Sequence, residues 1–173
     1  MSLFTDYTPD EQQLLLRSLQ AAAVAIAAAS LGRKTETVSE GVAAASLIME
    51  RTATTVSNSL ITAVQFELDQ RIARGEAFPQ FEQVASAPGA AEAALATLRD
   101  VAALLAEKAA PDVAQGFKQW LLEIAQRTAA AGKEGGNFWG RGAVSINDAE
   151  IAALHEIAKT LDVPPPTLGE SAS

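Results

Sequence analysis

The sequence predicts an all-α protein, a single-domain bundle of about five to six helices. Three observations support this fold class. Hydrophobic residues make up 49% of the 173 residues but aromatic residues only 5%, since alanine, the best helix former, supplies much of the apolar content. Apolar side chains recur at helical spacing, and helix start and stop residues separate these segments. The length fits one domain with a core of its own.

The first helix is expected at about residues 9–31. Thr8, Pro9 and Glu11 supply an N-cap, a proline at the first helical position and an acidic residue at the third. Gly32 and the cations after it end the helix. Its apolar face comprises Leu15, Leu16, Leu19, Ala22, Ala23 and Ile26, and its polar face comprises Gln13, Arg17 and Gln20.

Residues 38–74 permit two interpretations. A single face of apolar residues is compatible with one long helix, but poor helix formers between Thr52 and Ser59 favour two helices with a break near 55–59. Ser57 or Asn58 would then cap a helix that runs to Arg74 and is ended by Gly75. The shared apolar face comprises Val42, Met49, Ala53, Val56, Leu60 and Val64.

Two further helices follow a connection at 75–89. The first is expected at about 90–109, opened by Pro88-Gly89, and the second at about 111–131, with Pro111 at its first position. The second has the strongest core pattern in the chain. Its apolar stripe comprises Val113, Phe117, Trp120, Leu121 and Ile124.

The last helix is expected after Ser145 and Asp148, which have the spacing of a capping box, and the prolines at 164–166 terminate it. The bundle domain is therefore assigned to residues 1–163, and 164–173 has the composition of a disordered tail. The apolar stripe of this helix comprises Ile151, Leu154, Ile157, Ala158 and Leu161.

Charge and cysteine content restrict the function classes. The net charge near −8 disfavours binding to nucleic acid or to an anionic membrane. The absence of cysteine excludes disulfides and thiolate metal sites. Residues 1–6 lack a signal-peptide pattern, and the apolar stretch 21–31 is shorter than the roughly 20 residues of a membrane span. A cytoplasmic location without a membrane span is expected.

The most unusual segment is a loop at 132–142 that contains five glycines and two aromatic residues. It lacks the Gly-Lys-Ser/Thr sequence of a phosphate-binding loop. One interpretation is an ordered turn held by Phe138 and Trp139 against the bundle. The other is a ligand or partner surface, since aromatic residues and arginine are enriched at binding hot spots. The candidate residues of this surface are Lys133, Phe138, Trp139 and Arg141.

No catalytic residue, metal ligand or cofactor is predicted. His155 is the single histidine and borders the apolar stripe of the last helix, so it is expected to be half exposed. The chain contains no Glu-x-x-His sequence, which argues against a di-iron carboxylate bundle. The carboxylates Glu40, Glu50 and Glu67 do not share one narrow helix face. Enzymatic activity is therefore not favoured.

The chain resembles an uncharacterised family of small bacterial all-helical proteins. The resemblance lies in the glycine-aromatic loop Gly135–Gly142, followed by Val144-Ser145 and Asp148–Glu150, and in the opening Phe4-Thr5 and Thr8–Glu11. It implies a helical fold and carries no activity to transfer. More weakly, Ile146–Val163 is similar to the closing helix of the tellurite-resistance TerB-like fold, a metal-associated domain.

Three hypotheses of function remain open. The favoured one is a non-enzymatic interaction or scaffold module that binds a protein partner or forms a homo-oligomer, through an alanine-rich helix face or the loop aromatics. The second is a small-molecule-binding bundle that uses the 132–142 loop. The third is a TerB-like metal-binding bundle, for which no ligand residues are assigned.

Overall fold

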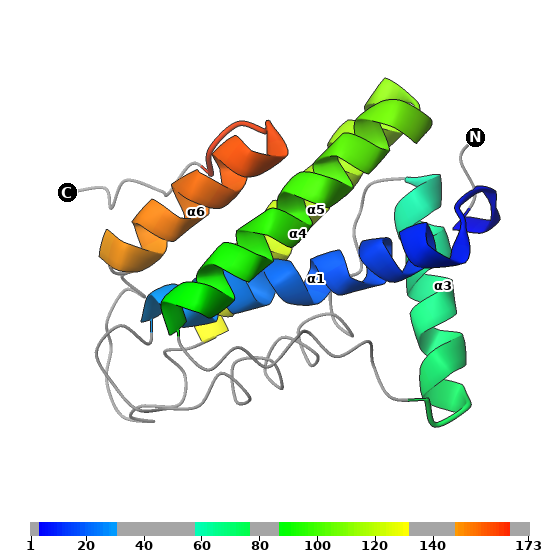
Figure 1. Ribbon diagram of the computed structural model, residues 1–173, viewed down its shortest axis with the longest axis horizontal. Coiled ribbons are helices and arrows are strands. Elements are labelled where there is room, and N and C mark those ends of the chain that lie inside the picture. Colours follow the sequence, from blue (N-terminus) through cyan, green and yellow to red (C-terminus); the bar gives the residue numbers. More distant parts are fainter. Residues whose placement is uncertain (1–3, 31–57, 77–86, 132–147, 167–173) are drawn as a thin grey trace.

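The computed structural model describes residues 4–30, 58–76, 87–131 and 148–166. In these segments the chain forms five α-helices and one short 3-10 helix, which confirms the all-α bundle (Figure 1). The elements are η1 (Phe4–Asp6), α1 (Pro9–Ser30), α3 (Ser59–Ala73), α4 (Ala87–Lys108), α5 (Pro111–Ala131) and α6 (Asp148–Leu161).

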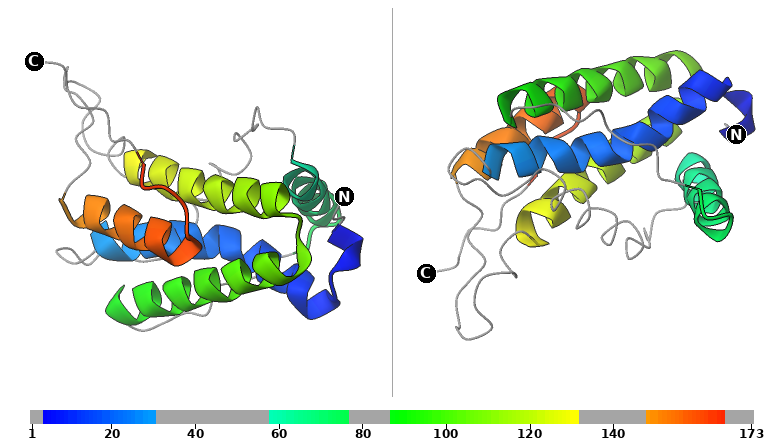
Figure 2. Two further views of the ribbon diagram at one scale, coloured as in Figure 1. Left: turned by 90° about the horizontal axis from the view of Figure 1, so that it is seen from above. Right: turned by 60° about the horizontal axis from the view of Figure 1, so that its bottom comes forward.

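Helix α1 occupies the middle of the bundle. It contacts each of the other four α-helices, and its contact with α4 is the most extensive. Seen from above, α4 and α5 flank α1 on opposite sides, and α6 lies beside it (Figure 2, left). Helix α3 instead crosses the N-terminal half of α1, close to η1, at one end of the molecule (Figure 1).

The second half of α1 is buried on all sides. The seven consecutive residues from Gln20 to Ile26 are each at most 4% exposed, and seven residues cover every direction around a helix of 3.6 residues per turn. Arg17 lies on the exposed side as expected. The assignment of Gln20 to the polar face was wrong, since it is 2% exposed. The helix has no solvent-facing side at this position because it is enclosed by its neighbours.

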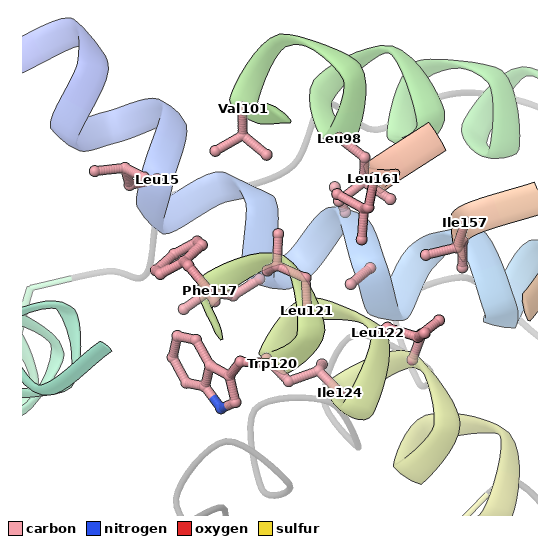
Figure 3. Packing of buried hydrophobic residues seen from close by; sticks show 14 of the residues in the cluster. Leu15, Leu98, Val101, Phe117, Trp120, Leu121, Leu122, Ile124, Ile157 and Leu161 are labelled. Carbon is pink, nitrogen blue, oxygen red and sulfur yellow. The ribbon is translucent and has the colours of Figure 1, made fainter. Parts of the chain in front are cut away.

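Large side chains from the surrounding helices complete the core (Figure 3). The stripe predicted for α5 is confirmed, with Phe117, Trp120, Leu121 and Ile124 buried and Val113 packed at its margin. The rings of Phe117 and Trp120 meet edge to face, with centroids 5.5 Å apart, the geometry that aromatic quadrupoles favour. Burial of each such side chain contributes roughly 1.5–3 kcal/mol.

A capping box fixes the start of α1. The Thr8 amide donates to Oε2 of Glu11 (2.8 Å), and the Glu11 amide donates to Oγ1 of Thr8 (3.4 Å). The other carboxylate oxygen of Glu11 lies 2.6 Å from Nζ of Lys108 at the end of α4. The Lys108 ammonium and the Thr8 amide hold the pKa of Glu11 below its ordinary value, and Glu11 raises the pKa of Lys108.

Both α3 and α6 end with a residue at positive φ. Gly75 (φ 68°) ends α3, and the Glu76 amide donates to the Arg71 carbonyl (2.9 Å). Asp162 (φ 53°) ends α6, and the Val163 amide donates to the Ala158 carbonyl (3.0 Å). These are Schellman motifs. The chain therefore leaves α6 at Asp162, before the prolines that were expected to terminate the helix.

The boundaries of the central segments agree with the sequence patterns. Helix α3 begins after Asn58, one of the two caps considered, so a helix start near 55–59 is confirmed. Residues 31–57 lie outside the described part, and the helix expected there stays a prediction. Within the described residues, no helix combines the length and apolar character that crossing a membrane requires.

The enclosure of α1 predicts that added volume is not tolerated there. Ala22→Leu should lower the free energy of unfolding by about 1–3 kcal/mol, because Ala22 is fully buried and overpacking forces its neighbours apart. Ala103→Leu adds the same atoms at an exposed position of α4 and should change stability by less than about 0.5 kcal/mol. Urea denaturation of both variants measures this, and equal effects would contradict the enclosure.

The ion pair of Glu11 predicts a dependence of stability on pH. Because its pKa is lowered in the folded chain, the ionised carboxylate stabilises the fold above the ordinary value of 4.5, and this contribution is lost as the pH falls through the lowered pKa. Glu11→Gln should therefore be less stable than the parent at pH 7 and nearly equal to it at pH 2–3. Thermal unfolding over this range tests it, with the exposed Glu92→Gln as control.

Candidate functional site

The four loop residues selected from the sequence, Lys133, Phe138, Trp139 and Arg141, lie outside the residues that the structure describes. Their role as a ligand or partner loop stays a prediction. His155 lies exposed on α6. Across 4–30, 58–76, 87–131 and 148–166, no three histidine or carboxylate side chains gather in a group that would hold a metal ion.

The polar groups of Lys118 and Trp120 are buried on α5 but do not form a common site. Lys118 is 9% exposed and Trp120 is 2% exposed. Within the part of the chain that the structure describes, the indole Nε1 of Trp120 has no hydrogen-bond partner. Residues two positions apart point about 160° away from each other around a helix. The two side chains therefore leave α5 on nearly opposite sides.

The exposed surface of α3 is the candidate site. Among the described residues, the large hydrophobic side chains exposed to solvent are Phe66 (64%) and Ile72 (55%), and both belong to this helix. The side turned to the bundle carries Leu60, Ile61, Val64 and Leu68, all buried. Helical spacing places Phe66 directly opposite this side. We call the side around Phe66 the outer face; it comprises Ser59, Thr62, Ala63, Phe66, Asp69, Gln70 and Ala73.

Asn58 anchors the start of α3 to α5. Its Oδ1 accepts hydrogen bonds from the amides of Leu60 (3.0 Å) and Ile61 (3.1 Å), which is the N-cap geometry. Its Nδ2 donates to the Val113 carbonyl in the first turn of α5 (3.0 Å). Asn58 is 5% exposed. Its side-chain amide therefore accepts from two backbone amides at the start of α3 and donates to a backbone carbonyl of α5.

Gly116 makes room for this anchor. A Cβ at this position would lie 2.5 Å from Nδ2 of Asn58, well inside the contact distance. The hydrogen bonds at both ends of the Asn58 amide prevent it from turning away. The glycine in the second turn of α5 is therefore explained by the close approach of the Asn58 side chain, despite its cost to helix stability.

The charges of α3 lie in its second half. The segment from Asn58 to Phe66 contains no charged residue, whereas Glu67–Glu76 contains three carboxylates and two arginines, for a net charge of −1. Nε of Arg71 lies 2.8 Å from Oε1 of Glu67. With its oxygen turned towards α3, the amide of Gln13 on α1 accepts from Nη2 of Arg71 at 3.1 Å.

Arg74 continues this network towards the end of the helix. Its guanidinium pairs with Glu67 (3.4 Å) and with Glu76. The hydrogen bond between Arg74 and Glu76 lowers the pKa of Glu76 and raises the pKa of Arg74. Arg74 and Glu76 are exposed, Glu67 is half-buried, and the three groups stabilise each other locally. The outer face itself carries one charge, that of Asp69.

Sequence reasoning did not select Phe66. The apolar pattern of 38–74 placed Leu60 and Val64 on the buried face, and the same helical wheel puts Phe66 on the opposite side. An aromatic residue on the side opposite a complete apolar stripe was the sequence signal that could have identified Phe66 as exposed. The contact between Asn58 and Gly116 left no such signal, because it joins residues far apart in the sequence.

Comparisons with known proteins found no relative of this chain. No protein family, no curated protein and no solved structure matches the chain. The resemblances described from the loop and the last helix therefore stay predictions, and function is argued from the geometry.

The contact between Asn58 and Gly116 predicts that the effect of Gly116→Ala on the free energy of unfolding changes sign with the residue at position 58. Alanine in a helix interior is normally about 0.5–1 kcal/mol more stable than glycine, but Gly116→Ala should destabilise the parent chain because its Cβ collides with Asn58. In an Asn58→Ser background the cap is retained and the amide is removed, so Gly116→Ala should become stabilising. Urea denaturation of the four variants measures the coupling, and additive effects would show that the two side chains do not interact.

Proposed function

We propose that the chain is a non-enzymatic helical interaction module that self-associates. The observation that carries the proposal is the outer face of α3, where Phe66 is 64% exposed on a helix whose opposite side is already packed. Aromatic side chains, phenylalanine among them, are enriched in the cores of protein interfaces relative to the rest of the surface.

The distribution of titratable groups supports an interaction module over an enzyme. In the described segments the pKa shifts belong to Glu11 and Lys108, and to Arg74 and Glu76, each within a surface ion pair. Active sites instead bring groups with perturbed pKa values together in a cleft. Each shift has a local structural explanation in a helix cap or helix end, so none calls for a catalytic role.

Composition supports the kind of partner proposed. A net charge of −8 repels phosphate backbones, so the partner is a protein and not a nucleic acid. The cysteine-free sequence is compatible with a reducing compartment, and the proposal includes a cytoplasmic location. The small-molecule alternative depends on the loop 132–142, which lies outside the described residues.

Self-association predicts a mass that rises with protein and salt concentration. Sedimentation equilibrium of the full chain should show the mass moving from 18.0 kDa towards twice that value at tens of micromolar. Raising the salt from 20 to 300 mM should strengthen the dimer, because two chains of charge −8 repel each other and salt screens this repulsion. A strict monomer at the highest concentration would refute the proposal.

A further inference from the structure

We infer that α3 opens from the folded molecule as one unit, while α1, α4, α5 and α6 stay packed together. We call these four helices the body. The side chain of Asn58, seated against Gly116 of α5, is the latch that keeps α3 closed. The opening is a conformational change within a single chain, so it does not depend on the proposed self-association.

The body does not need α3 for its own contacts. Each of its four helices contacts every other one, and the contact between α1 and α4 is the most extensive. Among the described elements, the main contacts of α3 are with α1, α5 and η1, at one end of the molecule (Figure 2, right). Opening of α3 therefore leaves the contacts within the body in place.

Helix α3 buries a small part of itself against its neighbours. Its buried apolar residues are Leu60, Ile61, Val64 and Leu68. No residue of α3 after the last of these is buried, whereas every residue of α1 from Gln20 to Ile26 is buried. Because the free energy of an opening grows with the surface that it exposes, α3 opens at a lower cost than the body unfolds.

Asn58 couples the docking of α3 to the formation of the helix. One side-chain amide caps the first turn of α3 and also donates to the Val113 carbonyl of α5. These hydrogen bonds depend on distance and direction, so displacement of the start of α3 breaks the contact with α5. A helix of 15 residues without tertiary contacts is marginally stable in water. Helix α3 therefore loses its own hydrogen bonds when it leaves the body.

The opening changes the surface of the molecule. It exposes the four buried apolar side chains of α3 and the parts of α1 and α5 on which this helix packs. In the closed state this surface is covered, and the amide of Asn58 is buried with it. The fold therefore contains a cover at one end of the bundle whose closure depends on a polar contact between Asn58 and α5.

Native-state hydrogen exchange of the parent chain tests the opening. After correction for intrinsic rates, the amides of Val64 and Leu68 should exchange at least about tenfold faster than those of Ala22–Ile26. Their exchange should also accelerate less steeply with urea, because the opening exposes less surface than global unfolding. A single urea dependence shared by both groups of amides would overturn the inference, since α3 would then open only when the body unfolds. Exchange of Val64 and Leu68 without any urea dependence would overturn it as well.

Two substitutions separate the opening of α3 from unfolding of the body. Ile157→Val removes a buried methyl group from α6, which is not among the main contacts of α3. It should speed exchange of the α1 amides about threefold to tenfold and change that of the α3 amides less than about twofold. Asn58→Ala removes the latch and should speed exchange of the α3 amides at least about tenfold. Equal acceleration of both groups by Ile157→Val would overturn the separate opening, and unchanged α3 exchange in Asn58→Ala would overturn the latch.

Discussion

Close packing around α1 is the interaction on which the bundle depends. Along its second half this helix presents alanine in most directions, and α4, α5 and α6 contact it from different sides. Short side chains bring helix axes close together, so the position of each neighbour is set by its distance from α1. The large residues Phe117, Trp120 and Leu121 then fill the space that remains between the outer helices.

Helix α3 is held by a different kind of interaction. Its apolar side is buried, but polar contacts at separate points orient it, through Asn58 and, with the oxygen of the Gln13 amide turned towards α3, through Arg71. Hydrogen bonds are directional, and apolar contacts are not. This division explains how a peripheral helix keeps one side packed and the opposite side, with Phe66, turned to solvent.

Local patterns predicted most of the fold. The Thr8 capping box, Pro111 at the start of α5 and the cap at Asn58 each depend on residues within a few positions, and the structure confirms them. Gln20 was misplaced, because a helical wheel assumes a solvent side and α1 has none there.

The candidate site was less accessible to sequence reasoning. The anchor between Asn58 and α5 depends on a contact across 55 positions, which no local pattern records. The exposure of Phe66 depends on how α3 lies against the bundle, so its wheel position alone did not identify it. The glycine-aromatic loop stood out in composition, but its residues 132–142 are outside the described chain.

The central place of α1 also has a consequence for biosynthesis. Among the α-helices that the structure describes, α1 is translated before the others, whereas α6, which packs against it, begins at Asp148. At typical rates the ribosome needs on the order of ten seconds to make the intervening chain. Until α4, α5 and α6 have all been made, the segment that will be the centre of the protein is incompletely covered. An alanine side chain has little apolar area to bury against another nascent chain. The small side chains that permit tight packing in the folded protein therefore also lower the tendency of the unpaired helix to aggregate.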